Sequence, residues 1–198
     1  MTRAVPRRFY DAGALEVAPQ LLNKLLVRRS LAARIVEVEA YGGADDPASH
    51  AYRGMTRRNS TMFGPPGRLY VYFTYGMHFC ANAVCGPAGE AEAVLLRALA
   101  PVSGLDEMRQ GRHQGVRRLD DHQLTSGPAK LCQAFGIGAD DDGADLVTGD
   151  RALRLVDDGV APPAQPGVSG RVGIRVAADR PWRFWVPGDR NVSVNRIS

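Results

Sequence analysis

The chain has 198 residues, of which 44% are hydrophobic and 23% are charged. This length favours a single hydrophobic core, and a chain of this size buries roughly 70% of the surface that its unfolded form exposes. It therefore needs neither a disulfide scaffold nor a structural metal, and disordered and collagen-like classes are excluded. No stretch approaches the ~18 consecutive apolar residues of a membrane span, and the first residues contain no hydrophobic signal core. We expect one domain over residues 1–198 and an intracellular protein, located in the cytoplasm (nucleoid) if it is bacterial.

The cysteines and histidines make no recognisable metal-binding pattern. The three cysteines are Cys80, Cys85 and Cys132, an odd number that leaves at least one unpaired, and we expect them to be small buried residues. No C-x-x-C or H-x-x-x-H spacing involves the four histidines, His50, His78, His113 and His122. Phosphate-binding glycine loops are also missing from the sequence. We therefore expect neither a metal nor a cofactor.

The charge is distributed unevenly along the chain. Residues 1–99 hold 12 Lys and Arg against 8 Asp and Glu, whereas residues 100–198 hold 13 of each. Residues 47–89 contain no acidic residue, yet they hold half of the chain's aromatic residues and the arginines Arg53, Arg57, Arg58 and Arg68. Such a window suits a phosphate backbone with bases to stack on. The alternative is a core hairpin with a solvated basic loop.

The first half of the chain predicts a helix, a strand and a long loop. Apolar residues recur at helical spacing over residues 11–29, with Pro19 early in the stretch, and predict a helix that starts near Pro19. Residues 33–41 alternate as a strand does, with one face made of Ile35, Glu37, Glu39 and Tyr41. Residues 42–66 carry glycine and proline and show no periodicity, so we expect a loop, and so long a loop in a compact domain is usually functional.

The elements that follow are mostly strands. Residues 68–75 and 78–85 predict two strands joined by a tight turn that displays Tyr75 and Met77. Residues 93–100 are typical of a buried strand, interrupted by Arg97, whose charge needs a partner if it faces inward. Helices are predicted over residues 104–110 and 128–135, and short strands near 153–156, 171–176 and 183–186. The sequence therefore predicts a single α+β domain with a largely antiparallel sheet and flanking helices.

Glu39 is the first candidate for chemistry, because it shares a strand face with Tyr41 immediately before the long loop. That loop delivers His50, and Arg97 offers a cation that could orient a water beside the carboxylate. One carboxylate with one positioned water suits hydrolysis of a bond whose leaving group is already good. Glu37 lies beside Glu39 rather than across a substrate, so we interpret it as structural. The alternative for Glu39 itself is a solvent-facing residue on an amphipathic strand.

Seven motifs carry a resemblance that spans nearly the whole chain. They are RIVEVEAY (34–41), His50, RRN (57–59), LYVYFTYGMHFCAN (69–82), LLRALAP (95–101), SGPAKLC (126–132) and RVGI (171–174). In order and spacing they resemble the alkyladenine (3-methyladenine) DNA glycosylase family. The resemblance implies a single α+β domain with a curved antiparallel sheet, similar to the C-terminal domain of formyltransferases.

The resemblance also implies roles for individual residues. Glu39 matches the family's catalytic carboxylate, Arg97 matches the arginine that shares the attacking water, and Val172 matches the residue whose backbone carbonyl completes the binding of that water. Tyr41, His50 and Tyr72 match the aromatic walls that sandwich a flipped base. Asn82 matches the side chain that crowds the exocyclic amino group of guanine. Tyr75 matches the residue inserted into the duplex through the minor groove, with Met77 beside it. Arg57 and Arg58 are also expected to bind DNA.

The implied function is that of a monofunctional DNA glycosylase of base excision repair, working as a monomer on double-stranded DNA without metal or cofactor. It would flip out alkylated or deaminated purines (3-methyladenine and 7-methylguanine, with hypoxanthine and ethenoadenine as further candidates) and hydrolyse the N-glycosidic bond with a water activated by Glu39. No lysine matches a Schiff-base role, so no lyase activity is expected. One alternative is a non-catalytic binding module for distorted or damaged nucleic acid, and another is a formyl-transfer or small-molecule domain that shares the fold.

Overall fold

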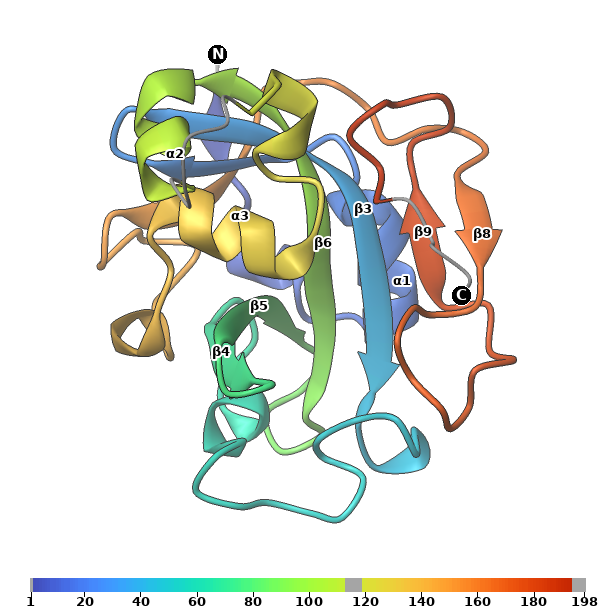
Figure 1. Ribbon diagram of the computed structural model, residues 1–198. Coiled ribbons are helices and arrows are strands. Elements are labelled where there is room, and N and C mark those ends of the chain that lie inside the picture. The colour runs from blue at the N-terminus through green and yellow to red at the C-terminus, as the bar shows by residue number, and fades with distance from the viewer. Residues whose placement is uncertain (1, 113–118, 194–198) are drawn as a thin grey trace.

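One antiparallel sheet runs through the computed structural model, which describes residues 2–112 and 119–193 (Figure 1). Over these residues the strands are β1 (Arg3–Ala4), β2 (Leu25–Arg28), β3 (Leu31–Gly42), β4 (Leu69–Thr74), β5 (His78–Cys85), β6 (Glu92–Ser103), β7 (Leu153–Asp157), β8 (Gly167–Ser169) and β9 (Arg183–Trp185). The α-helices are α1 (Ala14–Leu21), α2 (Leu105–Gly111) and α3 (Pro128–Phe135). Short 3-10 helices are η1 (Arg7–Phe9), η2 (Gly43–Asp45), η3 (Ser60–Phe63), η4 (Asp121–Gln123) and η5 (Ala139–Asp141).

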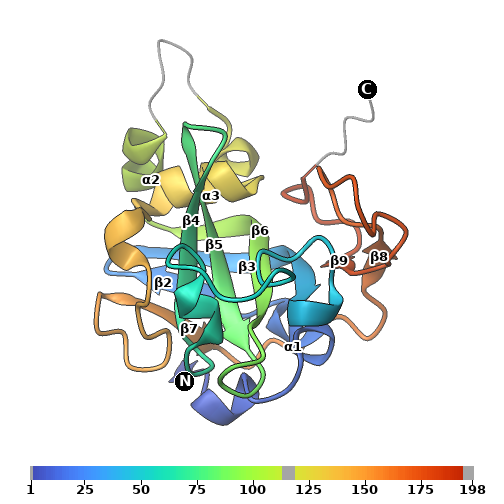
Figure 2. The same ribbon diagram turned by 90° about the horizontal axis from the view of Figure 1, so that it is seen from below.

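The sheet is centred on its two longest strands, β3 and β6, which have 12 residues each. The strand order is β1, β7, β2, β3, β6, β5, β4, while β9 pairs with the second half of β3 and β8 pairs with β9. All these pairs are antiparallel. The helices α1 and α3 lie on opposite sides of the curled sheet (Figures 1 and 2). The predicted single α+β domain with a largely antiparallel sheet and flanking helices is therefore confirmed.

Most predicted elements agree with the structure, but the N-terminal helix was placed wrongly. The helix is α1, which begins at Ala14 and contains Pro19 near its end instead of starting there. Asn23 then adopts a left-handed φ of 69°, and Leu25 and Leu26 belong to β2. Short apolar runs do not distinguish helix from strand by periodicity alone. Pairing of β2 with both β3 and β7 decides the outcome here, because it gives these residues partners for their backbone groups.

The strand predicted at residues 171–176 is also wrong. The chain instead forms β8 just before this segment, and residues 171–176 run as an irregular loop. Gly173 has φ +77° and Ala177 has φ +49°, and left-handed residues of this kind interrupt a strand. The guanidinium of Arg171 turns inward to a buried carboxylate, which fixes the start of this loop.

The strand that carries the candidate carboxylates is irregular. The residues of β3 in the hydrophobic core are odd-numbered up to Ile35 and even-numbered from Val38 onward. The register between β3 and β6 shifts between Ile35 and Glu37 and again between Glu37 and Val38. Side chains beyond a bulge change faces. The prediction that Ile35 shares a face with Glu37 and Glu39 is therefore wrong, and the bulge turns both carboxylates away from the hydrophobic core.

Gly111 marks a close approach between α2 and α3 that can be tested. A β-carbon at Gly111 would lie 2.5 Å from the backbone carbonyl oxygen of Gln133. Replacing a helical glycine with alanine normally stabilises a protein by roughly 0.5–1 kcal/mol. Because of the overlap, we expect Gly111→Ala to lower the free energy of unfolding by about 1–3 kcal/mol in a denaturant titration. The exposed neighbour Gln110 gives the control, since Gln110→Ala should change stability by less than about 0.5 kcal/mol. A stabilised Gly111→Ala protein would contradict this packing.

Candidate active site

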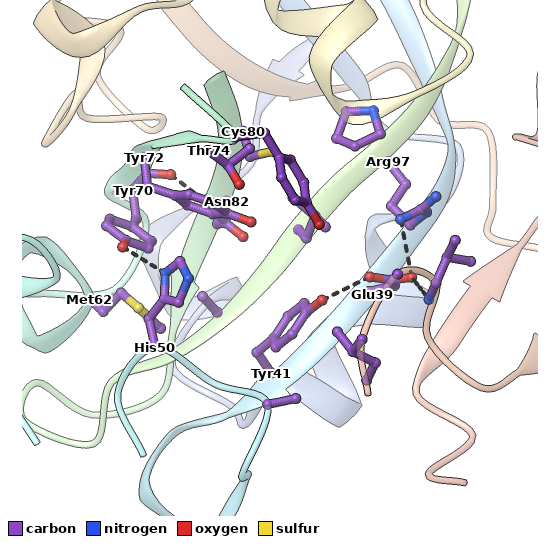
Figure 3. A pocket seen from close by; sticks show the side chains of 18 residues that line it. Glu39, Tyr41, His50, Met62, Tyr70, Tyr72, Thr74, Cys80, Asn82 and Arg97 are labelled. Carbon is purple, nitrogen blue, oxygen red and sulfur yellow. Dashed lines mark hydrogen bonds and ion pairs between the residues drawn. The ribbon is translucent and has the colours of Figure 1, made fainter. Parts of the chain in front are cut away.

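Glu39 is fully buried in β3, and its carboxylate accepts hydrogen bonds on both oxygens. The hydroxyl of Tyr41 donates to Oε2 at 2.9 Å, and the backbone N–H of Val172 donates to Oε1 at 2.7 Å. Nη1 of Arg97 lies 3.3 Å from the same Oε1. Figure 3 shows the carboxylate between the hydroxyl of Tyr41 on one side and the guanidinium of Arg97 on the other. A carboxylate has about four lone-pair positions, so these three contacts leave room for one further donor.

The surroundings of Glu39 favour a basic carboxylate. Burial raises its pKa above the ordinary value, and this effect outweighs the opposing influence of Arg97, the Val172 N–H and the Tyr41 hydroxyl. Burial and the neighbouring Glu39 likewise raise the pKa of Tyr41, so that the phenol stays protonated and donates to the carboxylate. A carboxylate with a raised pKa accepts a proton from water more readily than an exposed one does.

Arg97 is the predicted inward-facing charge of β6, and it has partners. It is 7% exposed, and besides Glu39 it contacts Glu37, which accepts a hydrogen bond from its Nε at 2.9 Å. Burial works to lower the pKa of Arg97, but the two carboxylates raise it, so the guanidinium stays charged. The interpretation of Glu37 as structural agrees with its burial and with its hydrogen bonds from Arg97, Arg183 and Ser193.

Aromatic side chains from three segments surround the space next to Glu39 (Figure 3). The ring centroids of His50 and Tyr72 are 4.5 Å apart with the rings nearly perpendicular. Nδ1 of His50 lies 3.0 Å from the hydroxyl of Tyr70, whose pKa is raised to about 12 by burial. Burial and the nearby Arg58 lower the pKa of His50, so its ring is neutral at pH 7. These electron-rich faces suit a flat, positively charged ligand.

The hairpin of β4 and β5 carries a buried amide side chain and, at its turn, two exposed side chains. Asn82 is buried on β5, and its Nδ2 donates to the backbone carbonyl of Tyr70 at 3.1 Å. At the turn, Tyr75 and Gly76 both have left-handed φ angles, 51° and 65°, as tight hairpin turns require. This conformation leaves Tyr75 81% exposed and Met77 66% exposed. In Figure 2 the hairpin rises from the sheet with this turn at its outer end.

The predicted DNA-contacting arginines lie on the loop before β4. Arg57 and Arg58 are both exposed, and Nη2 of Arg58 donates to the backbone carbonyl of Phe73 at 2.7 Å, which ties the loop to the hairpin. The buried Asn59 holds the loop together, since its Nδ2 donates to the carbonyls of His50 and Gly54 at 2.8 and 3.1 Å. The long loop is therefore held by side-chain bonds together with short backbone turns, among them η2 and η3.

Val172 reaches Glu39 because its neighbour Arg171 is anchored. Arg171 makes a buried bidentate pair with Asp46, with Nη1–Oδ2 and Nη2–Oδ1 separations of 2.5 and 2.8 Å. Its guanidinium also lies 4.6 Å from the ring centroid of Tyr41. In the structure, the backbone N–H of Val172 contacts the carboxylate, whereas the predicted role of its carbonyl in binding water stays a prediction.

Most of the predicted site residues line one cavity of about 370 Å³, a size typical of small-ligand pockets. They are Glu39, Tyr41, His50, Tyr72, Tyr75, Asn82, Arg97 and Val172. Met77, Arg57 and Arg58 do not line it and lie on the exposed turn and loop near its rim. Over residues 2–112 and 119–193, no group of three His, Cys, Asp or Glu side chains could hold a metal ion, and His113 lies outside these residues.

Sequence reasoning missed several residues that line the cavity, among them Tyr70, Thr74, Cys80, Met62, Pro128 and Ile174. A signal for some of them was present, because alternation along β4 puts Tyr70 and Thr74 on the face of Tyr72, and alternation along β5 puts Cys80 on the face of Asn82. Nothing in local spacing pointed to the others, which reach the cavity through long-range packing.

Comparison with known proteins identifies the family of this chain. The family model described as methylpurine-DNA glycosylase matches residues 8–190. A protein of Burkholderia lata named "Putative 3-methyladenine DNA glycosylase" is 57% identical over 190 residues, which cover 96% of this chain and 90% of the relative. Proteins with the same name from Burkholderia cenocepacia and Leifsonia xyli are 58% and 51% identical and cover 96% and 98% of this chain and 90% and 93% of their own lengths. The chain therefore belongs to the methylpurine-DNA glycosylase family.

Proposed function

We propose that this protein is a monofunctional DNA glycosylase of base excision repair that releases alkylated or deaminated purines from duplex DNA as a monomer. One observation carries the proposal: Glu39 and Arg97 meet at 3.3 Å inside an aromatic cavity whose rim holds the exposed Tyr75. The relatives' names favour 3-methyladenine as a substrate. We include 7-methylguanine because it carries the same kind of positive charge.

The target atom of a base is inaccessible inside a duplex, so the nucleotide must leave the stack before hydrolysis. Extrusion costs a few kcal/mol and is easiest for damaged, weakly paired bases. An exposed aromatic residue on a rigid turn can fill the space that the base vacates, which offsets part of this cost. Tyr75 suits this role because the turn holds it outward, while the exposed Arg57 on the loop before β4 can contact phosphate.

The cavity suits an alkylated purine. Alkylation at N3 or N7 makes the base cationic, and the faces of Tyr41, Tyr72 and neutral His50 attract a cation by roughly 0.5–2 kcal/mol. The same charge makes the base a good leaving group. The buried amide of Asn82 would crowd the amino group of guanine and so disfavour normal guanine, whereas the positive charge of 7-methylguanine would offset the same crowding. Hypoxanthine and ethenoadenine leave as neutral bases and need an added proton donor, so we propose them as slower substrates.

Hydrolysis would use the one acceptor position that the contacts of Glu39 leave open. A water donating there could be held beside Nη1 of Arg97, and Glu39 would take its proton as the water attacks the anomeric carbon. The carboxylate also stabilises the oxocarbenium-like sugar. The products are a free base and an abasic site. Since no lysine of the sequence matches a Schiff-base role, we propose hydrolysis without strand cleavage.

The first test replaces the proposed base. Glu39→Gln keeps the size of the side chain and removes its ability to accept a proton, so we expect single-turnover base release to slow by about 10²–10⁴-fold. Binding of a duplex with one lesion should persist, because Tyr75, Arg57 and Arg58 are unchanged. Glu90→Gln, an exposed glutamate, is the matched control and should release base like the wild type. A wild-type protein that binds lesion DNA but never releases base would instead support the non-catalytic binding module.

The second test uses pH. Glu39 must be ionised to act as a base, and burial raises its pKa above 4.5 despite the opposing effect of Arg97, so release should increase with pH through a midpoint above 4.5. Arg97→Gln removes a cation that favours the carboxylate, so its midpoint should lie higher still. Single-turnover rates of the wild type and Arg97→Gln are compared on the same duplex, because any titration of the substrate itself then affects both pH profiles equally. A wild-type midpoint at or below 4.5, or a lower midpoint for Arg97→Gln, would argue against Glu39 as the base.

A further inference from the structure

Glu37 is a second buried carboxylate beside the proposed base, and the proposed reaction gives it no role. Its Oε1 accepts hydrogen bonds from Nε of Arg97 at 2.9 Å, Nε of Arg183 at 2.6 Å and Oγ of Ser193 at 2.9 Å. Its Oε2 accepts the backbone N–H of Ser193 at 2.6 Å. Three of these donors converge on Oε1 and one reaches Oε2, and Glu37 is not among the residues that line the cavity. Glu39, in contrast, lines the cavity.

The guanidinium of Arg97 is held at two corners that do not take part in the proposed chemistry. Nε donates to Glu37, and Nη2 donates to Oγ of Ser193 at 3.1 Å. The third corner, Nη1, lies 3.3 Å from Glu39. Because a guanidinium is planar and rigid, fixing Nε and Nη2 fixes the direction of Nη1. Without these two bonds, the long side chain of Arg97 would populate many rotamers, most of which would place Nη1 away from Glu39.

An irregularity in the backbone of β6 also helps to direct Arg97 towards the two carboxylates. On β3 Glu37 pairs with Ala98 and the next residue pairs with Leu96, so Arg97 has no partner across the ladder. Leu96 and Leu99 both belong to the hydrophobic core, which shows that the side chains of β6 change faces between them. Arg97 thus lies at a bulge that faces the matching bulge in β3, and the two together bring one guanidinium to two carboxylates.

Arg183 balances the charge of this buried cluster. Its Nη1 donates to Oγ of Ser169 and its Nη2 donates to the carbonyl of Ser193, both at 3.2 Å, and it lies 4.7 Å from the ring centroid of Trp185. Burial works to raise the pKa of Glu37, but Arg97 and the bonds from Ser193 and Arg183 hold it below the ordinary value. Two carboxylates therefore face two guanidiniums, and loss of one carboxylate would leave an excess cation beside Glu39.

We propose that Glu37, fixed by Arg183 and Ser193, is a positioning residue that aims Nη1 of Arg97 at Glu39. This inference rests on the proposed function, since it concerns how the proposed base and its arginine are arranged. It also predicts a direction for a change in the pH profile. The titratable and charged groups that face Glu39 are Arg97 from β6, Glu37 and Tyr41 from β3, and Cys80 from β5, while Arg183 from β9 faces Glu37.

Glu37→Gln removes a like charge from beside Glu39 and leaves both arginines with one carboxylate. Ionisation of Glu39 should then be easier, so the acid limb of base release should move to lower pH, opposite to the shift expected for Arg97→Gln. The plateau rate should fall by about 10- to 100-fold because Arg97 is no longer aimed. The Kd for lesion DNA should stay within about threefold of the wild-type value, since Glu37 touches no surface that DNA could reach.

Two further variants make the result decisive. Glu92→Gln alters a carboxylate that accepts the backbone N–H of Ala14 and is not among the residues that line the cavity, so it should leave the acid limb unchanged. Ser193→Ala removes one hydroxyl from the cluster without burying a new charge, and should lower the plateau rate by about three- to tenfold even if Glu37→Gln does not fold.

The proposal is overturned if folded Glu37→Gln keeps the wild-type acid limb or shifts it upward, or if Ser193→Ala keeps the wild-type plateau. Either result would make Glu37 a purely structural residue while leaving the proposed function intact. A wild-type protein without base release in the same assay would contradict the proposed function itself, so the two failures are distinguishable.

Discussion

A guanidinium placed between two buried carboxylates is the interaction on which the site depends. Arg97 touches Glu37 with one nitrogen and lies beside Glu39 with another, and both carboxylates are out of contact with bulk solvent. Burying such charges is costly unless they are paired and hydrogen-bonded. The cluster meets this condition unequally, because Glu37 accepts four hydrogen bonds from its neighbours, whereas Glu39 accepts two and lines the cavity. That inequality gives two chemically identical side chains on one strand different properties.

The rest of the fold brings the charged cluster, the aromatic side chains and the exposed turn together. Pairing of β3 with β6 and β9 assembles the charged cluster from three strands, and the anchored Arg171 carries Val172 to the carboxylate. The β4–β5 hairpin adds the aromatic wall and holds Tyr75 at its outer turn. For the function proposed above, a buried carboxylate next to the exposed Tyr75 is what an enzyme needs if it must first draw a base out of a duplex and then exclude water from it.

Much of this arrangement could be predicted from the sequence. Alternation along the strand predicts that Tyr41 lies beside Glu39. The glycine after Tyr75 predicts a tight turn that displays this tyrosine. The single charge in an apolar strand predicts that Arg97 has a buried partner. The bulges could not be predicted, because strict alternation is the only signal that a single strand gives, and so Ile35 was placed on the wrong face. Arg183 and Ser193 contact Glu37 from more than 140 positions away in the sequence, and local residue spacing does not predict such contacts. The helix predicted over β2 failed for a similar reason, since two neighbouring strands decided its conformation.

The most direct measurement is an experimental structure of the protein on a duplex in which an uncleavable, positively charged ring replaces the sugar of the flipped nucleotide. The account predicts one ordered water within hydrogen-bonding distance of both the Glu39 carboxylate and Nη1 of Arg97, facing the anomeric position of that ring, with Tyr75 in the vacated space. A ring bound elsewhere, or a Glu39 carboxylate with no water between it and the sugar, would contradict it.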